Sequence, residues 1–320
     1  MSAPATEGAA ATALRSVLTR AQQAAERCGR SPEQVRVVAV SKTKPVSVIR
    51  QVYDVGHRCF GENYVQEIVE KAPQLPSDIE WHFIGNLQSN KVKSLLAGVP
   101  NLDMVESVDD EKIANHLDRM VASLGRKPLK VLVQVNTSGE ESKFGVDPSY
   151  CVQLVKHVKL GCPNLIFAGL MTIGMLDYSS TPENFETLSN CRTEVCKELG
   201  IPEEQCELSM GMSADFEQAI EMGSTNVRIG STIFGAREYL KKDKSHASVC
   251  ECLVLSEHSN LSRKLVACHM HMLLECCLRV WHRTMCGYEV LGILMISCSH
   301  SSILLICLEC SFIFFDSGNY

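Results

Sequence analysis

Lys42 is the residue of this sequence best placed to do chemistry. It follows a run of small and β-branched residues, Val37 to Ser41, and Pro45 then opens a helical pattern. A lysine at the carboxyl end of a buried strand lies where α/β folds keep their active sites. Its amine can bind a phosphate as a charge, or attack an aldehyde as a nucleophile. The structural alternative is a lysine that ends the strand and reaches water.

A second cation, Arg228, lies in the last predicted strand, 226–230. In a closed barrel the last strand pairs with the first, so we expect Arg228 beside Lys42 at one rim. Two neighbouring cations attract an anion or favour the neutral, nucleophilic form of the lysine. Small residues in the last two loops could supply N–H groups and hydroxyls to a phosphate: Ser213, Gly230, Ser231 and Thr232. Ordinary capped turns would explain these small residues, but not the two cations.

Two further polar residues lie at or near predicted strand ends. Asn63 follows the second strand, and His82 lies within the third among apolar neighbours. A histidine in that setting is more often a hydrogen-bonded core residue than a ligand or a catalyst. Both interpretations of His82 stay open at this point.

The elements that must position these residues alternate along the chain. An Ala-rich helix over 10–27 comes first, and predicted helices then separate the strands and end near glycines. Eight strands in this order favour a closed (β/α)₈ TIM barrel, an α/β fold, and the lack of GxGxxG after the first strand disfavours an open dinucleotide-binding sheet. The predicted strands are 35–41, 57–61, 80–84, 102–107, 129–135, 165–171, 206–210 and 226–230.

The amino-acid composition and charge of the chain limit the classes of function that it can have. The formal charge is −6 over 320 residues, and the sequence has no basic stripe, so nothing favours nucleic-acid binding. The first residues lack a signal-peptide pattern, which favours a cytoplasmic protein, with a mitochondrial pool as the alternative. The seven cysteines before residue 245 show no CxxC spacing and fit reduced thiols.

Three segments differ in character. Residues 1–9 form a flexible N-terminus, 10–242 the barrel, and 243–320 a Cys-rich apolar tail that we expect to be poorly structured. Residues 290–315 are long enough for a membrane segment but contain several Ser, His and Glu residues. Zinc binding by Cys250, Cys252, His269 and His271 is disfavoured by their spacing, so we expect no metal site.

Several long motifs occur in order over about residues 10–242, and together they resemble the motifs of one known protein family. The chain resembles the pyridoxal-phosphate homeostasis protein family, also called the proline-synthetase co-transcribed homologue family, which is similar to the N-terminal barrel of alanine racemase. The motifs are SKTKP, FGENYVQE, WHFIG, LQSNK, VQVNTSGEESK, GLMTIG, LSMGMSADFEQAI and GSTNVRIGSTIFGAREY. The tail after Lys242 departs from the family.

The resemblance implies a fold-type-III barrel that holds pyridoxal 5'-phosphate (PLP). Lys42 matches the family's Schiff-base lysine, Arg228 the arginine facing the pyridine nitrogen, and Ser213 with Gly230, Ser231 and Thr232 the phosphate cup. Asn63 and His82 lie in motifs that line the cofactor. The implied role is PLP binding and delivery to PLP-dependent client enzymes, in vitamin B6 homeostasis, without efficient catalysis and without catalytic residues.

Two other functions remain. A weak racemase-like enzyme would use the same lysine, but no added β-domain with a second acid/base is recognisable. A barrel that binds another phosphorylated metabolite would use Lys42 only as a counter-charge.

Overall fold

The computed structural model describes residues 8–140, 144–174, 181–236, 297–299 and 302–304. The chain forms two compact units, Met1–Tyr239 and Leu240–Tyr320. In the second unit the described residues form one antiparallel pair, β9 (Ser297–Ser299) with β10 (Ser302–Leu304). The four residues considered for zinc binding and residues 1–7 lie outside the described residues, as does most of 290–315.

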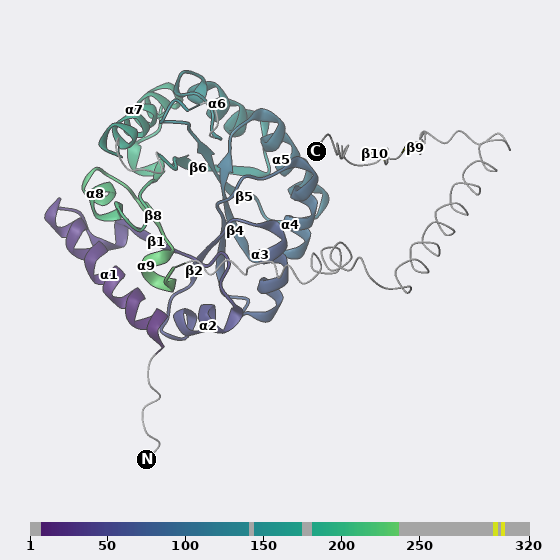
Figure 1. The fold of residues 1–320 in the computed structure, drawn as a ribbon. Coiled ribbons are helices and arrows are strands. Elements are labelled where there is room, and N and C mark those ends of the chain that lie inside the picture. Colours follow the sequence, from purple (N-terminus) through teal and green to yellow (C-terminus); the bar gives the residue numbers. More distant parts are fainter. Residues whose placement is uncertain (1–7, 141–143, 175–180, 237–296, 300–301, 305–320) are drawn as a thin grey trace, which may run out of the picture. The chain divides into compact units, whose positions relative to one another are not determined.

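The first unit is a closed barrel of parallel strands arranged in chain order, as Figure 1 shows. Its first and last strands pair in register, with Val38 opposite Arg228, which confirms the predicted (β/α)₈ barrel. The strands are β1 (Arg36–Val40), β2 (Cys59–Glu62), β3 (Glu80–Phe83), β4 (Leu102–Val108), β5 (Leu129–Gln134), β6 (Leu165–Met171), β7 (Glu207–Ser209) and β8 (Asn226–Ile229).

Helices surround the strands. The longer helices pack through an apolar face, as in α5, where Ile113, Leu117 and Val121 are buried. Asp110 caps the first turn of α5 by accepting from Ile113 N at 2.6 Å. The helices are α1 (Ala9–Arg27), α2 (Val46–Asp54), α3 (Val65–Lys71), α4 (Val92–Gly98), α5 (Glu111–Ser123), α6 (Cys151–Gly161), α7 (Thr181–Leu199), α8 (Phe216–Glu221) and α9 (Ser231–Phe234). Short 3₁₀ turns lie at Pro32–Gln34, Ala72–Gln74, Ser89–Lys91, Pro148–Tyr150 and Glu203–Gln205.

Helix α1 lies where the barrel closes, next to α2, α8 and α9 (Figure 1). Its buried face packs into the main apolar core between strands and helices. Two ion pairs tie its exposed side to α8: Arg20 with Glu217 at 2.9 Å and Arg27 with Glu221 at 2.7 Å. The N-terminal helix therefore covers the seam between β8 and β1 rather than standing apart from the barrel.

The interior of the barrel is divided between apolar and polar residues. Met104, Leu132 and Met171 form a small apolar cluster separate from the main core. Polar side chains from β3, β4, β7 and β8 hydrogen-bond to one another. Buried polar groups need such partners, so this network belongs to the architecture of the barrel.

One element differs from expectation. We expected Gly230, Ser231 and Thr232 to form a small-residue turn. Ser231 and Thr232 instead begin the single helical turn α9 (Ser231–Phe234), because the N–H groups of Ile233 and Phe234 both donate to Gly230 O. No helix among the described residues is long and apolar enough to cross a bilayer.

Candidate functional site

A cavity of about 200 Å³ opens at the carboxyl ends of the strands and gathers most of the predicted site residues. Lys42, Asn63, Ser213, Arg228, Gly230 and Ser231 all line it. Its apolar walls come from Val40, Ile84, Met212, Ile173 and Phe234. An apolar cavity with a few convergent polar groups is the usual form of a small-molecule site.

Lys42 follows β1 directly, in a turn whose backbone is tightly held. Ser41 N donates to Gly61 O at 2.9 Å, and Ser41 Oγ donates to Glu62 Oε1 at 2.7 Å. Thr43 adopts a left-handed conformation, with φ of 63°, and its N–H donates to Glu67 Oε2 at 2.8 Å. A β-branched residue rarely adopts this conformation, so the surrounding contacts must hold it there.

Lys71 is the centre of those contacts. Its Nζ donates to Ser41 O at 3.0 Å and pairs with Glu62 Oε1 and Glu67 Oε2 at 2.7 Å each. Burial raises the pKa of Glu62, and the adjacent ammonium of Lys71 opposes that rise. Side chains from β2 and α3 thus bond the residues before and after Lys42 and fix the direction in which the lysine leaves the strand.

Arg228 lies on β8, beside β1, as barrel closure predicts. The side chain is buried; its Nη1 donates to Ser209 Oγ at 2.5 Å and its Nη2 to Thr172 O at 2.7 Å. Burial lowers the pKa of Arg228, while Glu106 and Asp215 act in the opposite sense. A guanidinium starts from so high a pKa that it stays charged, so the cavity contains a fixed cation.

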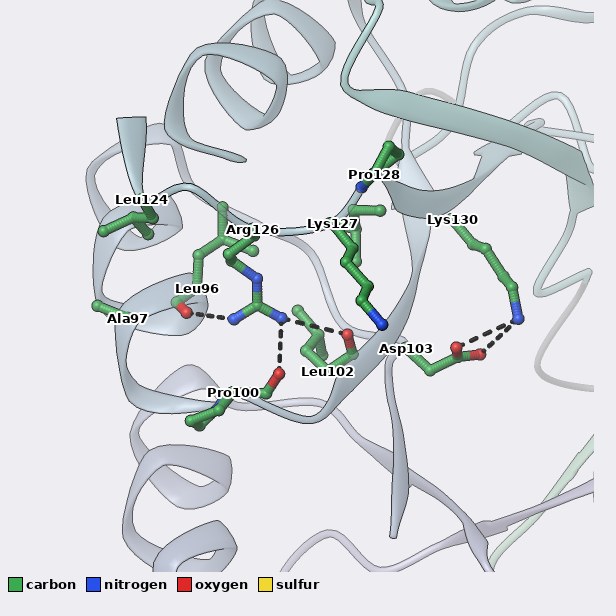
Figure 2. A pocket seen from close by; sticks show the side chains of 11 residues that line it. Leu96, Ala97, Pro100, Leu102, Asp103, Leu124, Arg126, Lys127, Pro128 and Lys130 are labelled. Atoms are coloured by element: carbon green, nitrogen blue, oxygen red, sulfur yellow. Dashed lines mark hydrogen bonds and ion pairs between the residues drawn. The ribbon is translucent and has the colours of Figure 1, made fainter. Parts of the chain in front are cut away.

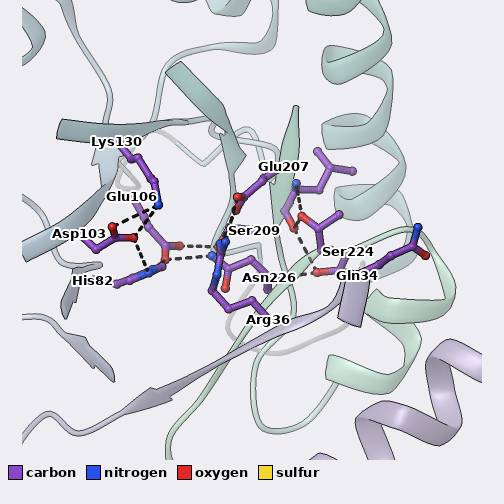
Figure 3. A network of polar contacts seen from close by, with 12 residues as sticks. Gln34, Arg36, His82, Asp103, Glu106, Lys130, Glu207, Ser209, Ser224 and Asn226 are labelled. Atoms are coloured by element: carbon purple, nitrogen blue, oxygen red, sulfur yellow. Dashed lines mark hydrogen bonds and ion pairs between the residues drawn. The ribbon is translucent and has the colours of Figure 1, made fainter. Parts of the chain in front are cut away.

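His82 does not line the cavity. It is fully buried on β3, where its Nδ1 lies 2.6 Å from Glu106 Oε1 (Figure 3). Burial lowers the pKa of His82, but Cys59 and Glu106 outweigh that effect and raise it to about 10. Glu106 favours the protonated form of this imidazole, and the two side chains form a buried pair inside the barrel, which agrees with the core alternative considered for His82.

Glu106 is a central residue that sequence reasoning missed. One carboxylate oxygen accepts from His82 and from Asn226 Nδ2 at 3.1 Å, and the other accepts from Ser209 Oγ at 2.5 Å. Burial raises the pKa of Glu106, but hydrogen bonds and charges, those of His82 first, lower it to about 2. The available signal was a carboxylate at a buried position, since Glu106 alternates along β4 with Met104 and Val108 and a buried charge needs partners.

The last two loops meet as predicted. Ser213, after β7, accepts through Oγ from Gly230 N at 3.2 Å and from Thr232 N at 3.4 Å. Thr232 Oγ1 donates to Ser213 O at 3.4 Å, so Thr232 supports the loop without lining the cavity. Asp215 Oδ1 accepts from Met212 N at 2.6 Å and closes the turn that presents Ser213.

A larger cavity of about 700 Å³ lies at the opposite ends of β4 and β5 (Figure 2). Three of its charged groups make structural contacts. Arg126 donates to the carbonyl oxygens of Leu96, Val99, Pro100 and Leu102, and Lys130 pairs with Asp103 at 3.2 Å. None of the predicted site residues line this cavity. The chemistry therefore favours the smaller cavity as the site.

The described part of the chain offers no group of three or more His, Cys, Asp or Glu side chains that could hold a metal ion. The seven cysteines before residue 245 are free thiols. Six of the seven are buried, the exception being Cys28.

Comparison with known proteins places the chain in a class and then in a family. The family model for the alanine racemase N-terminal domain matches residues 13–238. The pyridoxal phosphate homeostasis protein of Mus musculus is 54% identical over 241 residues, covering 72% of this chain and 88% of the mouse protein. The Homo sapiens protein of that name is 53% identical over 264 residues, covering 77% and 94%. The chain belongs to the pyridoxal phosphate homeostasis protein family.

A solved structure supports this placement. PipY of Synechococcus elongatus, solved with PLP bound, aligns with a TM-score of 0.56 and 32% identity, covering 68% of this chain and all of PipY (100%).

Proposed function

We propose that this protein binds PLP, holds it as a Schiff base on Lys42, and takes part in PLP homeostasis without efficient catalysis. The observation that carries the proposal is the meeting of Lys42 and Arg228 in one cavity beside the Ser213 loop. A primary amine, a fixed cation and hydroxyl or amide donors suit an aldehyde that also carries a phosphate. The PLP-bound structure of PipY supports the same ligand.

The residues of the cavity fit this cofactor. Ser213, Gly230, Ser231 and Thr232 form the polar loops that would receive the phosphate. Asn63 lines the cavity, and its Oδ1 is buried without a hydrogen-bond partner, which leaves an acceptor for a ligand donor. Such an orphaned polar atom is costly unless a ligand or water satisfies it.

Arg228 sets the chemistry that the cofactor supplies when bound. PLP withdraws electrons from a carbon attached to its imine most strongly when its ring nitrogen is protonated. A guanidinium facing that nitrogen donates a hydrogen bond without giving up its proton. We infer that the ring stays a weak electron sink, which favours holding the cofactor over turning over an amino acid.

The residues around the cavity support a carrier over a racemase. Its titratable side chains, within the part of the chain that the structure describes, are those of Lys42, Lys44 and Arg228. Lys44 Nζ donates to Ala236 O at 2.7 Å, at an exposed position. A racemase needs a second acid/base on the opposite face of the substrate. We therefore propose a cytoplasmic PLP carrier whose partners are PLP-dependent client enzymes, with weak racemase-like activity as the second candidate.

The deciding experiment is the absorption spectrum of the purified protein with PLP, before and after borohydride, for the wild type and Lys42→Ala. We expect a visible band that borohydride abolishes by fixing the cofactor covalently, and that Lys42→Ala lacks. Lys44→Ala is the matched control, because it removes a neighbouring amine of the same cavity, and it should keep the band. A folded wild-type protein without the band would refute the PLP proposal and leave a barrel for another phosphorylated ligand.

A second measurement separates carrier from enzyme. Alanine or serine is incubated with the PLP-loaded protein in deuterated water, and the Cα position is followed by NMR. A carrier leaves the Cα proton in place, whereas deuterium incorporation that depends on Lys42 would establish the racemase-like alternative.

A further inference from the structure

We propose that Glu106, acting through the hydroxyl of Ser209, is a positioning residue that fixes the Arg228 guanidinium toward the ligand cavity. Neither residue lines that cavity. The inference rests on the proposed function, because the ligand of Arg228 is taken to be PLP.

The direction of the hydrogen bonds supports this role. Ser209 has a single hydroxyl proton, and an ionised carboxylate can only accept, so Ser209 donates to Glu106 Oε2 at 2.5 Å. The lone pairs of Ser209 Oγ then accept from Arg228 Nη1, also at 2.5 Å. The carboxylate thus orients the hydroxyl, and the oriented hydroxyl receives the guanidinium on one side.

Glu106 can act as an anchor because it is itself immobilised. Donors from β3, β7 and β8 occupy its two oxygens, and the side chain has no exposed surface. Arg228 also donates from Nη2 to the Thr172 carbonyl at 2.7 Å. Two bonded nitrogens define the plane of a guanidinium, which sets the direction of its other donors.

A different role for Glu106 would be to neutralise Arg228 without orienting it. The two roles make different predictions for Ser209. Neutralisation acts through space and does not need the hydroxyl, whereas positioning through Ser209 requires it. Coupling between the two residues is therefore the property to measure.

Ser209→Ala removes the hydroxyl without changing any charge, and Ser224→Ala is the matched control. Ser224 is equally buried, but its hydroxyl bonds only the carbonyl oxygens of Leu208, Met210 and Asn226. We expect Ser209→Ala to raise the Kd for PLP about tenfold or more and to shift the absorption maximum of the bound ligand. Ser224→Ala should keep the wild-type spectrum and a Kd within about twofold of the wild-type value.

Glu106→Gln completes the test. We expect it to change the Kd in the native background and to have little further effect in the Ser209→Ala background, because the connection is already broken. Should Ser209→Ala fail to fold, the spectrum of Glu106→Gln is compared with that of Glu207→Gln, a carboxylate that pairs with Arg36 instead. Only Glu106→Gln should shift the absorption maximum.

Failure of PLP binding and failure of the positioning role give different results. Wild-type protein that does not bind PLP would refute the proposed function. Wild-type protein that binds PLP, with Ser209→Ala matching Ser224→Ala in Kd and spectrum, would overturn the positioning role. Fully additive effects of Ser209→Ala and Glu106→Gln would also overturn it, since independent residues add.

Discussion

His82 is fully buried, and its contact with Glu106 favours the protonated form of its imidazole. Its pKa, raised to about 10, lies well above the ordinary value for a histidine. A pKa that is higher in the folded than in the unfolded state means that protonation stabilises the fold. The contribution of His82 is complete below about pH 6.5, its unfolded pKa, and is lost as the pH rises toward 10. Glu106 contributes in the opposite range and loses its share as the pH falls toward 2.

The variant His82→Asn tests this ionisation. Asparagine can keep a donor toward Glu106 but cannot bind a proton, so the free energy of unfolding should depend less on pH between 6.5 and 10 than in the wild type. Urea unfolding at several pH values measures the difference. Groups that do not contact His82 contribute equally to both profiles, so the comparison removes their share. Parallel profiles for wild type and variant would show that His82 is not charged in the fold.

Residues of the site differ in how far the sequence reveals them. The proximity of Lys42 and Arg228 follows from strand order, because a closed barrel always joins its first and last strands. Glu106 lies in the middle of β4, and its partners come from three other strands. Which interior side chains meet depends on strand tilt and on register shifts such as those between β3, β4 and β5, which no single segment encodes.

At the scale of elements, local sequence signals were enough to predict the strands of the barrel and the helix that precedes them. The predicted strands and the predicted first helix agree with the structure to within about two residues at each end, because hydrophobic runs, caps and C-terminal glycines act within one segment. The one-turn helix α9 escaped prediction because four residues are too few to show a helical period.

Gly85 shows how two neighbouring elements approach each other at the mouth of the barrel. It follows β3, and a Cβ placed on it would lie 2.0 Å from the carbonyl oxygen of Asn63. We expect Gly85→Ala to displace the Asn63 loop, lowering the free energy of unfolding by about 1–3 kcal/mol and weakening PLP binding. Chemical denaturation and PLP titration measure the two effects.

Gly161→Ala is the control for this prediction. Gly161 ends α6, and an added Cβ there would meet nothing nearer than 3.6 Å, in the His157 ring. The substitution should leave the free energy of unfolding within about 0.5 kcal/mol of the wild-type value. Equal stability of the Gly85 and Gly161 variants would contradict the close approach described at Asn63.

At the scale of the whole molecule, the barrel carries all the residues of the proposed site. The family model ends at residue 238, and the contacts divide the chain at Tyr239. We propose that residues 10–242 form a self-sufficient domain. A chain that ends at Lys242 should therefore melt at the same temperature as the full chain and bind PLP with the same spectrum and Kd. Differential scanning calorimetry and PLP titration test this, and an insoluble or non-binding product would show that the barrel needs residues 243–320.

The seam between β8 and β1 has a consequence for how the molecule folds. Lys42 and Arg228 belong to opposite ends of the barrel sequence. They come together in one site only when the last strand, β8, has paired with the first, β1. A ligand of this site therefore binds only chains that have completed the slow, long-range step of folding. Such a ligand selects finished molecules and slows their unfolding, but it leaves the rate of folding unchanged.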